Sequence, residues 1–214
     1  MLHRKIFNSR EEWLAGRTNG IGASEAAAAI GMSPYETQYE LWERKTGQRE
    51  SKDLSGNAAV EYGNRMEPAM RAMFQAEHPE LELAYYQYDI LFQWDRPWMT
   101  ATLDGELTSD GGKCGILEIK TAQVGKAVQW ERWKNAVPQN YFIQVLHQLI
   151  VTGWDYVYLY AKLVKLDGDS ELRTYFFSAE QHKEEMEWLL SQEKKFWEEY
   201  VLQRKAPPNI LPSL

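Results

Sequence analysis

The spacing of apolar positions along the chain predicts an α/β protein. Apolar side chains recur at helical spacing over 58–77 and over 138–152, which predicts two amphipathic helices. The stripe of the first of these helices consists of Met66, Met70, Met73 and Phe74. β-prone runs predict the strands of a sheet, over 83–92, 98–103, 115–121, 156–166 and 171–177. We therefore expect a central mixed β-sheet flanked by helices.

Shorter helices are expected near the start of the chain. Asn8 or Ser9 can cap a first helix that ends near Arg17. The glycines at 20–22 predict a flexible loop, which leads into an alanine-rich helix over 24–30. A glycine loop that runs into a helix N-terminus presents free backbone N–H groups and the positive end of the helix dipole, which favours an anion. The alternative is a capped helix that packs through its alanines and binds nothing.

The remaining segments complete the expected organisation. Ser33-Pro34 is typical of a helix start, and this helix is expected to end at Gly47. The polar stretch 47–56 predicts a loop. A single domain is expected over 1–214, with N-terminal helices over 8–77, a catalytic sheet and helix over 83–177, and a C-terminal helix over 178–205.

Composition restricts the class of protein. A length of 214 residues is enough for one domain with a full core. Cys114 is the only cysteine, so an internal disulfide is excluded and a reducing setting is the simplest interpretation. The first residues lack the apolar run of a signal peptide, and no segment is apolar enough for a membrane span. We therefore expect a soluble, cytoplasmic protein.

The charge of the chain argues against a general nucleic-acid coat. The net charge is −7, and residues 53–177 carry 17 acidic side chains against 11 basic ones. An acidic chain of this kind is compatible with an enzyme that binds cations and contacts phosphates through a few placed basic residues.

The acidic part of the chain contains a candidate for catalysis, between Thr102 and Thr121. Successive side chains of a strand point to opposite faces, so Glu118 and Lys120 share one face of the predicted strand. Asp104-Gly105 reads as a turn that brings Asp104 beside them on a neighbouring strand. Two carboxylates and a lysine suit a hard divalent cation and the activation of a water, which is the chemistry of phosphodiester hydrolysis. The alternative is ordinary turn chemistry next to a solvated strand face.

Two helices supply further polar candidates. Glu67 precedes Pro68 beside the apolar stripe, and a proline inside a helix can bend the axis and point Glu67 at the sheet. Gln144 and Gln148 are four residues apart, so a helix aims them together. His147 lies next to them, and we interpret it as a hydrogen-bonded structural histidine rather than a ligand.

Five motifs occur in a fixed order along this chain. They are Arg17 followed by Gly22-Ala23-Ser24-Glu25-Ala26; Ser33-Pro34-Tyr35 with Glu40-Leu41-Trp42 and Lys45-Thr46-Gly47; Gly63-Asn64-Arg65-Met66-Glu67-Pro68; Leu103-Asp104-Gly105 with Leu117-Glu118-Ile119-Lys120; and Gln144 before Val151-Thr152-Gly153. Over about residues 13–160 this order resembles the YqaJ-like viral recombinase family, the lambda-exonuclease-like phage recombination nucleases.

The resemblance implies a restriction-endonuclease-like core with a PD-(D/E)xK site. By the family pattern Mg²⁺, for which Mn²⁺ would substitute, is held by Glu67, Asp104, Glu118 and the carbonyl of Ile119. Lys120 would lie beside the nucleophilic water, and Gln144 would support the site from the adjacent helix. Arg17 and Ser24 would match the positions that hold a 5′-terminal phosphate.

The implied activity is 5′-to-3′ digestion of linear double-stranded DNA, which leaves 3′ overhangs for recombination by strand annealing. The implied partners are DNA ends, a single-strand annealing protein and further copies of the chain in a ring-shaped trimer, in a bacterial host and encoded by a phage or prophage. Two alternatives remain open: an endonuclease of the same fold, and a DNA-binding or assembly protein without cleavage. The presence of Asp104, Glu118 and Lys120 together favours cleavage.

Overall fold

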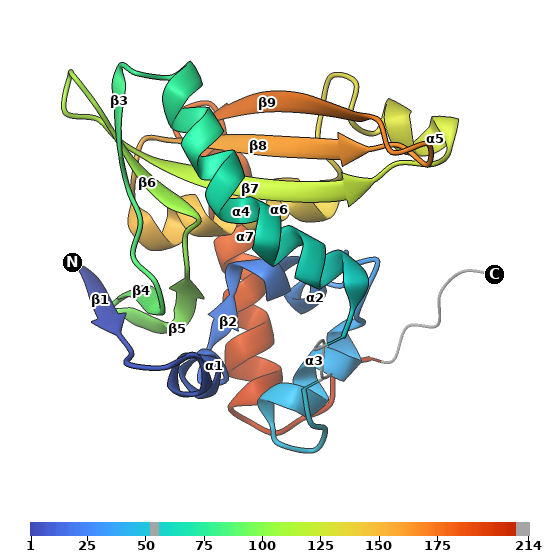
Figure 1. Cartoon of the computed structure of the whole chain (residues 1–214). Helices are drawn as coiled ribbons and strands as arrows, with labels where there is room; N and C mark the ends of the chain where they lie inside the picture. The colour runs from blue at the N-terminus through green and yellow to red at the C-terminus, as the bar shows by residue number, and fades with distance from the viewer. Residues whose placement is uncertain (52–55, 209–214) are drawn as a thin grey trace.

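Two mixed β-sheets form the centre of the molecule (Figure 1). The structure is a computed structural model, and it describes residues 1–51 and 56–208. The four-stranded sheet has the order β1-β4-β5-β2, with β1 Leu2–Ile6, β4 Asp89–Gln93, β5 Arg96–Ala101 and β2 Ile21–Gly22. The five-stranded sheet has the order β3-β6-β7-β8-β9, with β3 Leu81–Ala84, β6 Gly105–Ser109, β7 Cys114–Gln123, β8 Tyr156–Val164 and β9 Ser170–Ser178. In each sheet one pair of strands is parallel and the other pairs are antiparallel. The predicted α/β class is confirmed, and the strands that were expected in one central mixed sheet are divided between two mixed sheets.

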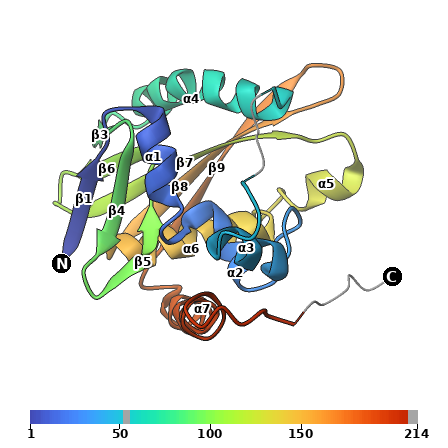
Figure 2. The ribbon, with the colours of Figure 1, turned by 90° about the horizontal axis from the view of Figure 1, so that it is seen from below.

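Helices cover the five-stranded sheet on both faces (Figure 2). The helices are α1 Arg10–Arg17, α2 Ala26–Ala29, α3 Gln38–Lys45, α4 Ala58–Glu77, α5 Ala127–Glu131, α6 Gln139–Thr152 and α7 Lys183–Lys195, with a 3-10 turn η1 at Ala23–Glu25 and a π-helical extension η2 at Phe196–Val201. Helix α4 lies on one face of the sheet and α6 on the other, and α7 lies beyond α6. Because both faces of β7 are covered, its residues 115–119 are all buried. None of the helices in the described part of the chain is long and apolar enough to cross a membrane.

Helix α4 packs through a narrower stripe than its sequence predicts. The side chain of Asn57 caps it by accepting hydrogen bonds from the backbone N–H groups of residues 59 and 60. Met70 and Phe74 are fully buried and pack with Leu117 of β7, and Met66 packs at the edge of the same cluster. Met73 is 42% exposed, so its predicted place in the core is wrong. The buried positions recur at intervals of four, and Met73 falls off that row.

The chain passes from one sheet to the other at two places, and the sequence patterns predicted neither of these crossovers. The strand predicted over 83–92 is two strands, β3 and β4, which belong to different sheets and are joined through Tyr88 in the left-handed conformation, with φ 58°. Likewise, the chain leaves the four-stranded sheet after β5 and enters the five-stranded sheet at β6. Asp104 therefore stands at a crossover between sheets, and the strand β6 that follows it was not predicted.

Several boundaries near the termini also differ from the predictions. Residues 21–22, expected in a flexible loop, form the buried strand β2, which pairs with β5. Helix α3 begins after Thr37, whose side chain forms a capping box with Glu40, rather than at Ser33. The C-terminal helix begins at Lys183, because β9 extends to Ser178 and a turn follows it. The loop predicted over 47–56 includes residues 52–55, which lie outside the described residues.

Candidate active site

The register of β6 and β7 places Asp104 opposite Glu118. The last pair of this antiparallel ladder is Gly105 with Leu117, so Asp104 and Glu118 follow one step beyond it. The Asp104 carboxylate then replaces the missing ladder partner, because its Oδ2 accepts a hydrogen bond of 2.7 Å from the backbone N–H of Ile119. The predicted juxtaposition of Asp104 and Glu118 is present in the structure.

The carbonyl of Ile119 points to the same side as its N–H. In a strand the N–H and the C=O of one residue point to the same edge. Since the N–H of Ile119 points to Asp104, its carbonyl faces away from β8 and towards the position where the β6 ladder has ended. A backbone oxygen is thus available next to the Asp104 carboxylate.

Glu118 is buried, with 3% of its surface exposed, and three side chains donate hydrogen bonds to it. Oε1 accepts from Lys120 Nζ at 2.6 Å and from Gln144 Nε2 at 2.7 Å. Oε2 accepts from Gln148 Nε2 at 2.5 Å. These donors compensate for the loss of water around a buried carboxylate, and a solvated strand face is excluded for this residue.

Glu67 comes to the same region from the opposite face of the sheet. It lies on α4. This helix runs so close to β7 that a Cβ at Gly63 would be only 3.2 Å from the hydroxyl of Thr121. Arg71, one turn further along α4, contacts Glu67 Oε1 at 2.5 Å and donates a hydrogen bond of 2.6 Å to the backbone carbonyl of Asp104. Arg71 therefore links α4 to the crossover at Asp104.

Burial and neighbouring negative charge disfavour the ionised forms of Asp104 and Glu67. Burial, followed by the charges of Glu118 and Glu67, raises the pKa of Asp104 well above its ordinary value. Burial and the charge of Glu118 raise the pKa of Glu67, although Arg71 acts in the other direction. Burial disfavours the charged form of Lys120, but the carboxylates of Glu118 and Asp104 outweigh it and raise the pKa of this amine. The region therefore concentrates negative charge around a protonated lysine.

This donor set fits a hard divalent cation in its chemistry. Three carboxylates and a backbone carbonyl are oxygen ligands, and a cation would offset the burial and the repulsion that raise the pKa values of Asp104 and Glu67. Within residues 1–51 and 56–208, however, no three His, Cys, Asp or Glu side chains already lie together at metal-binding separations. Glu67 is paired with Arg71, and Glu118 with Lys120 and two glutamines. Binding would thus require Glu67 to release Arg71, whereas Oε2 of Glu118 accepts a single hydrogen bond from the described residues and keeps a lone pair for a cation.

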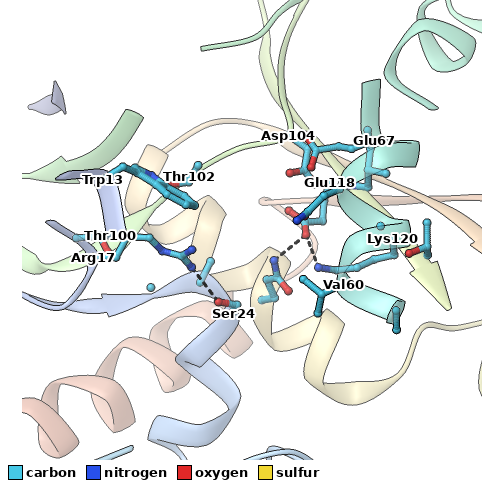
Figure 3. A pocket seen from close by; sticks show the side chains of 18 residues that line it. Trp13, Arg17, Ser24, Val60, Glu67, Thr100, Thr102, Asp104, Glu118 and Lys120 are labelled. Carbon is cyan, nitrogen blue, oxygen red and sulfur yellow. Dashed lines mark hydrogen bonds and ion pairs between the residues drawn. The ribbon is translucent and has the colours of Figure 1, made fainter. Parts of the chain in front are cut away.

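A basic group lies on the other side of the same pocket (Figure 3). Arg17, at the end of α1, donates a hydrogen bond of 3.3 Å to the hydroxyl of Ser24 in η1. Its guanidinium lies 4.7 Å from the centre of the Trp13 ring. Burial and the charge of Arg44 lower the pKa of Arg17, but a guanidinium remains charged at any physiological pH. No carboxylate in the described part of the chain lies within ion-pair distance of Arg17.

The free backbone N–H groups expected in this region are only partly available. The N–H of Gly22 donates to Glu25 Oε2 at 2.9 Å, and Glu25 is itself paired with Lys45 at 2.7 Å and Arg44 at 2.9 Å. The helix after Ser24 is also divided into a 3-10 turn and a helix of four residues, so its dipole is small. Any anion held here would therefore depend on Arg17 and Ser24.

The pocket has a volume of about 320 Å³ and joins the two groups. The residues predicted for the site that line it are Arg17, Ser24, Glu67, Asp104, Glu118, Ile119, Lys120 and Gln144. All eight predicted site residues are thus brought together. Trp13 also lines the pocket, and Gln148 contacts Glu118 from behind; neither was predicted for the site. The spacing of four residues between Gln144 and Gln148 was the sequence signal that could have identified Gln148.

Helix α6, which carries both glutamines, is fixed by a buried ion pair. His147 Nδ1 lies 2.8 Å from Glu193 Oε2 of α7, and Nε2 lies 3.0 Å from the carbonyl of Thr100, a pocket residue. His147 and Glu193 are both fully buried. The interpretation of His147 as a structural histidine is therefore confirmed.

The unfolding free energy is expected to fall by about 3–5 kcal/mol in Glu193→Gln, because the change leaves the imidazolium of His147 buried without its counter-charge. Burial opposes the charged imidazolium, but Glu193 outweighs it and raises the pKa of His147 above its ordinary value of 6.5. The stability from this pair is therefore fully present below pH 6.5 and is lost as the pH rises through the raised pKa. Urea unfolding at acidic and alkaline pH measures both effects. Glu187→Gln, an exposed change on the same helix, is the control, and equal unfolding midpoints of Glu193→Gln and the wild-type protein would contradict the argument.

Known proteins resemble this chain in sequence and in fold. A protein-family model described as the YqaJ-like viral recombinase domain matches residues 12–155. The chain is 29% identical over 207 residues to the uncharacterized protein YqaJ of Bacillus subtilis (strain 168), covering 97% of this chain and 61% of that protein. It thus spans about three fifths of the length of this curated relative.

Solved structures show the same fold. The alkaline exonuclease LHK-Exo from Laribacter hongkongensis is 20% identical, with a TM-score of 0.63 over 91% of this chain and 97% of that one. Its complex with dAMP gives a TM-score of 0.65 at 20% identity, over 91% and 96% of the two chains. A phage related exonuclease from Haemophilus somnus 129PT is 11% identical, with a TM-score of 0.51 over 86% and 96%. The chain therefore has the PD-(D/E)xK-like fold that its motifs imply.

Proposed function

The chain belongs to the YqaJ-like viral recombinase family, and from this premise we propose that it is a divalent-metal-dependent exonuclease that digests linear double-stranded DNA from the 5′ end. One observation carries the proposal. The same pocket has carboxylates and a lysine on one side, and an arginine and a serine hydroxyl on the other. The first group suits hydrolysis of a phosphodiester, and the second suits a terminal phosphate.

The acidic side would act on the scissile phosphate. Mg²⁺, or Mn²⁺ in its place, would be held by Glu67, Asp104, Glu118 and the Ile119 carbonyl, and would supply polarisation of a phosphate oxygen and an activated water. The Nζ of Lys120 lies 2.6 Å from Glu118 Oε1. From there the protonated amine would orient the attacking water. Gln144 keeps the same oxygen of Glu118 directed into the pocket.

The basic side would place the end of the DNA. A net charge of −7 provides few of the phosphate contacts by which a protein grips the interior of a duplex. A single charge-assisted contact from Arg17 to a 5′-phosphate, supported by Ser24, offers a stronger local anchor. Two of the structurally similar proteins are exonucleases, and one of them is also known as a complex with dAMP. This similarity supports an enzyme that works at DNA ends and releases nucleotides.

The remaining features of the proposal rest on the resemblance to the family's recombination nucleases. Digestion from the 5′ end would leave 3′ single strands, which a single-strand annealing protein would receive. Copies of the chain would assemble into a ring-shaped trimer around the duplex, in the cytoplasm of a bacterial host. A ring would retain the substrate without a broad basic surface.

Linear duplex DNA is expected to be degraded with Mg²⁺, whereas covalently closed circular duplex of the same sequence survives, because only the linear form offers a phosphate end to Arg17. Gel electrophoresis of both forms with Mg²⁺, and with EDTA as the control, measures this. Nicking of the closed circle as fast as the linear form is lost would identify an endonuclease instead. Binding of DNA without loss of either form would identify a DNA-binding protein without cleavage.

A further inference from the structure

We infer that Gln148 is a positioning residue for the Glu118 carboxylate, an inference that rests on the proposed function. The two oxygens of Glu118 have different partners. Oε1 accepts from both Lys120 and Gln144, whereas Oε2 accepts from Gln148 at 2.5 Å. Gln148 thus supplies the hydrogen bond by which the second oxygen is held.

Gln148 acts from outside the pocket. Glu118, Lys120 and Gln144 line the pocket, but Gln148 is not among the lining residues, and none of its surface is exposed. It cannot touch a substrate that occupies the pocket. Any effect of Gln148 on the reaction must therefore pass through Glu118.

The amide of Gln148 has a fixed direction. Its Nε2 faces Glu118, because a carboxylate accepts hydrogen bonds and its oxygens would repel the amide oxygen. The opposite atom, Oε1 of Gln148, is buried without a hydrogen-bond partner among the described residues. A buried acceptor without a partner lowers stability, so the fold gains little from this amide apart from the bond to Glu118. The hydrogen bond to Glu118 is therefore the contribution that requires a polar side chain at position 148.

The helix backbone keeps Gln148 in place. The hydroxyl of Thr152 donates to the backbone carbonyl of Gln148 at 2.9 Å, and the neighbouring His147 is tied to Glu193 and to the carbonyl of Thr100. Held at both oxygens, the Glu118 carboxylate cannot rotate about its last bond. Its plane is thus set before a metal arrives, as expected of side chains that orient a metal ligand from outside the coordination sphere.

Gln148→Met tests the inference, because methionine has a similar length and cannot donate a hydrogen bond. Partners that orient metal ligands typically contribute about 10–100-fold to metal affinity or activity. We expect the dissociation constant for Mn²⁺ alone, measured by isothermal titration calorimetry, to rise by about 10–100-fold. The kcat for digestion of linear DNA should fall over the same range while the KM for DNA ends is unchanged. Gln139→Met, an exposed change on the same helix, is the matched control.

Gln148→Asn is prepared in parallel, since it keeps a polar group but withdraws the amide from Glu118, and thermal unfolding shows that each variant is folded. If either folded variant binds Mn²⁺ and digests DNA like the wild-type protein, Gln148 only fills space and the inference is wrong, although the proposed function stands. A fall in KM or stability alone, with Mn²⁺ binding and kcat unchanged, also overturns it. A wild-type protein that neither binds Mn²⁺ nor digests DNA refutes the proposed function itself, and the inference with it.

Discussion

Digestion of linear DNA is expected to fall on the order of a thousand-fold or more in each of Asp104→Asn, Glu118→Gln and Lys120→Ala, because the three side chains act as a unit. Asp104 and Glu118 stand opposite each other at the end of the β6–β7 ladder, and Lys120 Nζ is 2.6 Å from Glu118. Removing either carboxylate reduces the charge that would hold the cation. Removing the amine leaves the carboxylates but loses the group placed to orient the water.

The effect on metal binding should separate the two kinds of residue. Mn²⁺ binding is expected to weaken in Asp104→Asn and Glu118→Gln, since each change removes a charged oxygen ligand. Lys120→Ala is expected to bind Mn²⁺ at least as well as the wild-type protein, because a competing positive charge is lost. Calorimetric titration measures the binding, and initial rates on end-labelled duplex measure the activity.

Exposed residues of the same types provide the controls. Asp110→Asn, Glu82→Gln and Lys113→Ala repeat the three changes at exposed positions on or next to strands of the same sheet. These variants should digest DNA like the wild-type protein. Asp104→Asn keeps an oxygen that can accept from the Ile119 N–H, so it should also remain folded. Near-wild-type digestion by any folded variant of Asp104, Glu118 or Lys120 would refute the assignment of the acidic side.

The sequence allowed the prediction of those elements whose patterns are local. Helix α4 has the predicted bounds, and α6 ends at Gly153, whose positive φ of 69° a glycine adopts without strain. The sharing of strand faces in β7 was also predictable, because Glu118 turns to α6 while Leu117 packs under α4. These features depend on spacing and capping within one element.

The division of strands between two sheets depends on contacts that are distant in the sequence. Tyr88 adopts a left-handed conformation without being glycine, so residues 83–92 lack the signal that would mark a break between β3 and β4. The capture of the Gly22 N–H by Glu25, by contrast, follows the three-residue spacing of a capping box and could have been recognised. The same holds for Thr37 and Glu40, which set the start of α3 in place of Ser33.

The hydrogen bond from Gln148 to Glu118 also depends on a contact between residues that are distant in the sequence. A spacing of four residues predicts that Gln144 and Gln148 point to one side of a helix. Only the packing of α6 against β7 gives each amide a different oxygen of Glu118. Charge and motif therefore identify the acidic residues, whereas the groups that orient them require the structure.

Arg17→Ala is expected to slow digestion of 5′-phosphorylated ends by about 100-fold and to leave digestion of 5′-hydroxyl ends almost unchanged. The guanidinium stands on the opposite side of the pocket from Glu118, is steadied by the Trp13 ring and the Ser24 hydroxyl, and has no carboxylate partner within the described residues. A guanidinium without a carboxylate partner is available to a phosphate. Removing it from such a buried, hydrogen-bonded charge pair costs about 2–5 kcal/mol. Ser24→Ala should produce a smaller effect of the same kind, since a neutral hydroxyl makes a weaker bond to phosphate than a guanidinium.

The measurement compares initial rates on two duplexes that differ only in the 5′ group. Arg10→Ala, an exposed arginine on the same helix α1, is the matched control and should preserve the preference for phosphate. If Arg17→Ala slows both ends equally, Arg17 is a general DNA contact or a structural residue, and the terminal phosphate is held elsewhere. Since the N–H of Gly22 is already bonded to Glu25, it cannot replace the lost cation, so a true phosphate anchor at Arg17 should show the difference between the two ends.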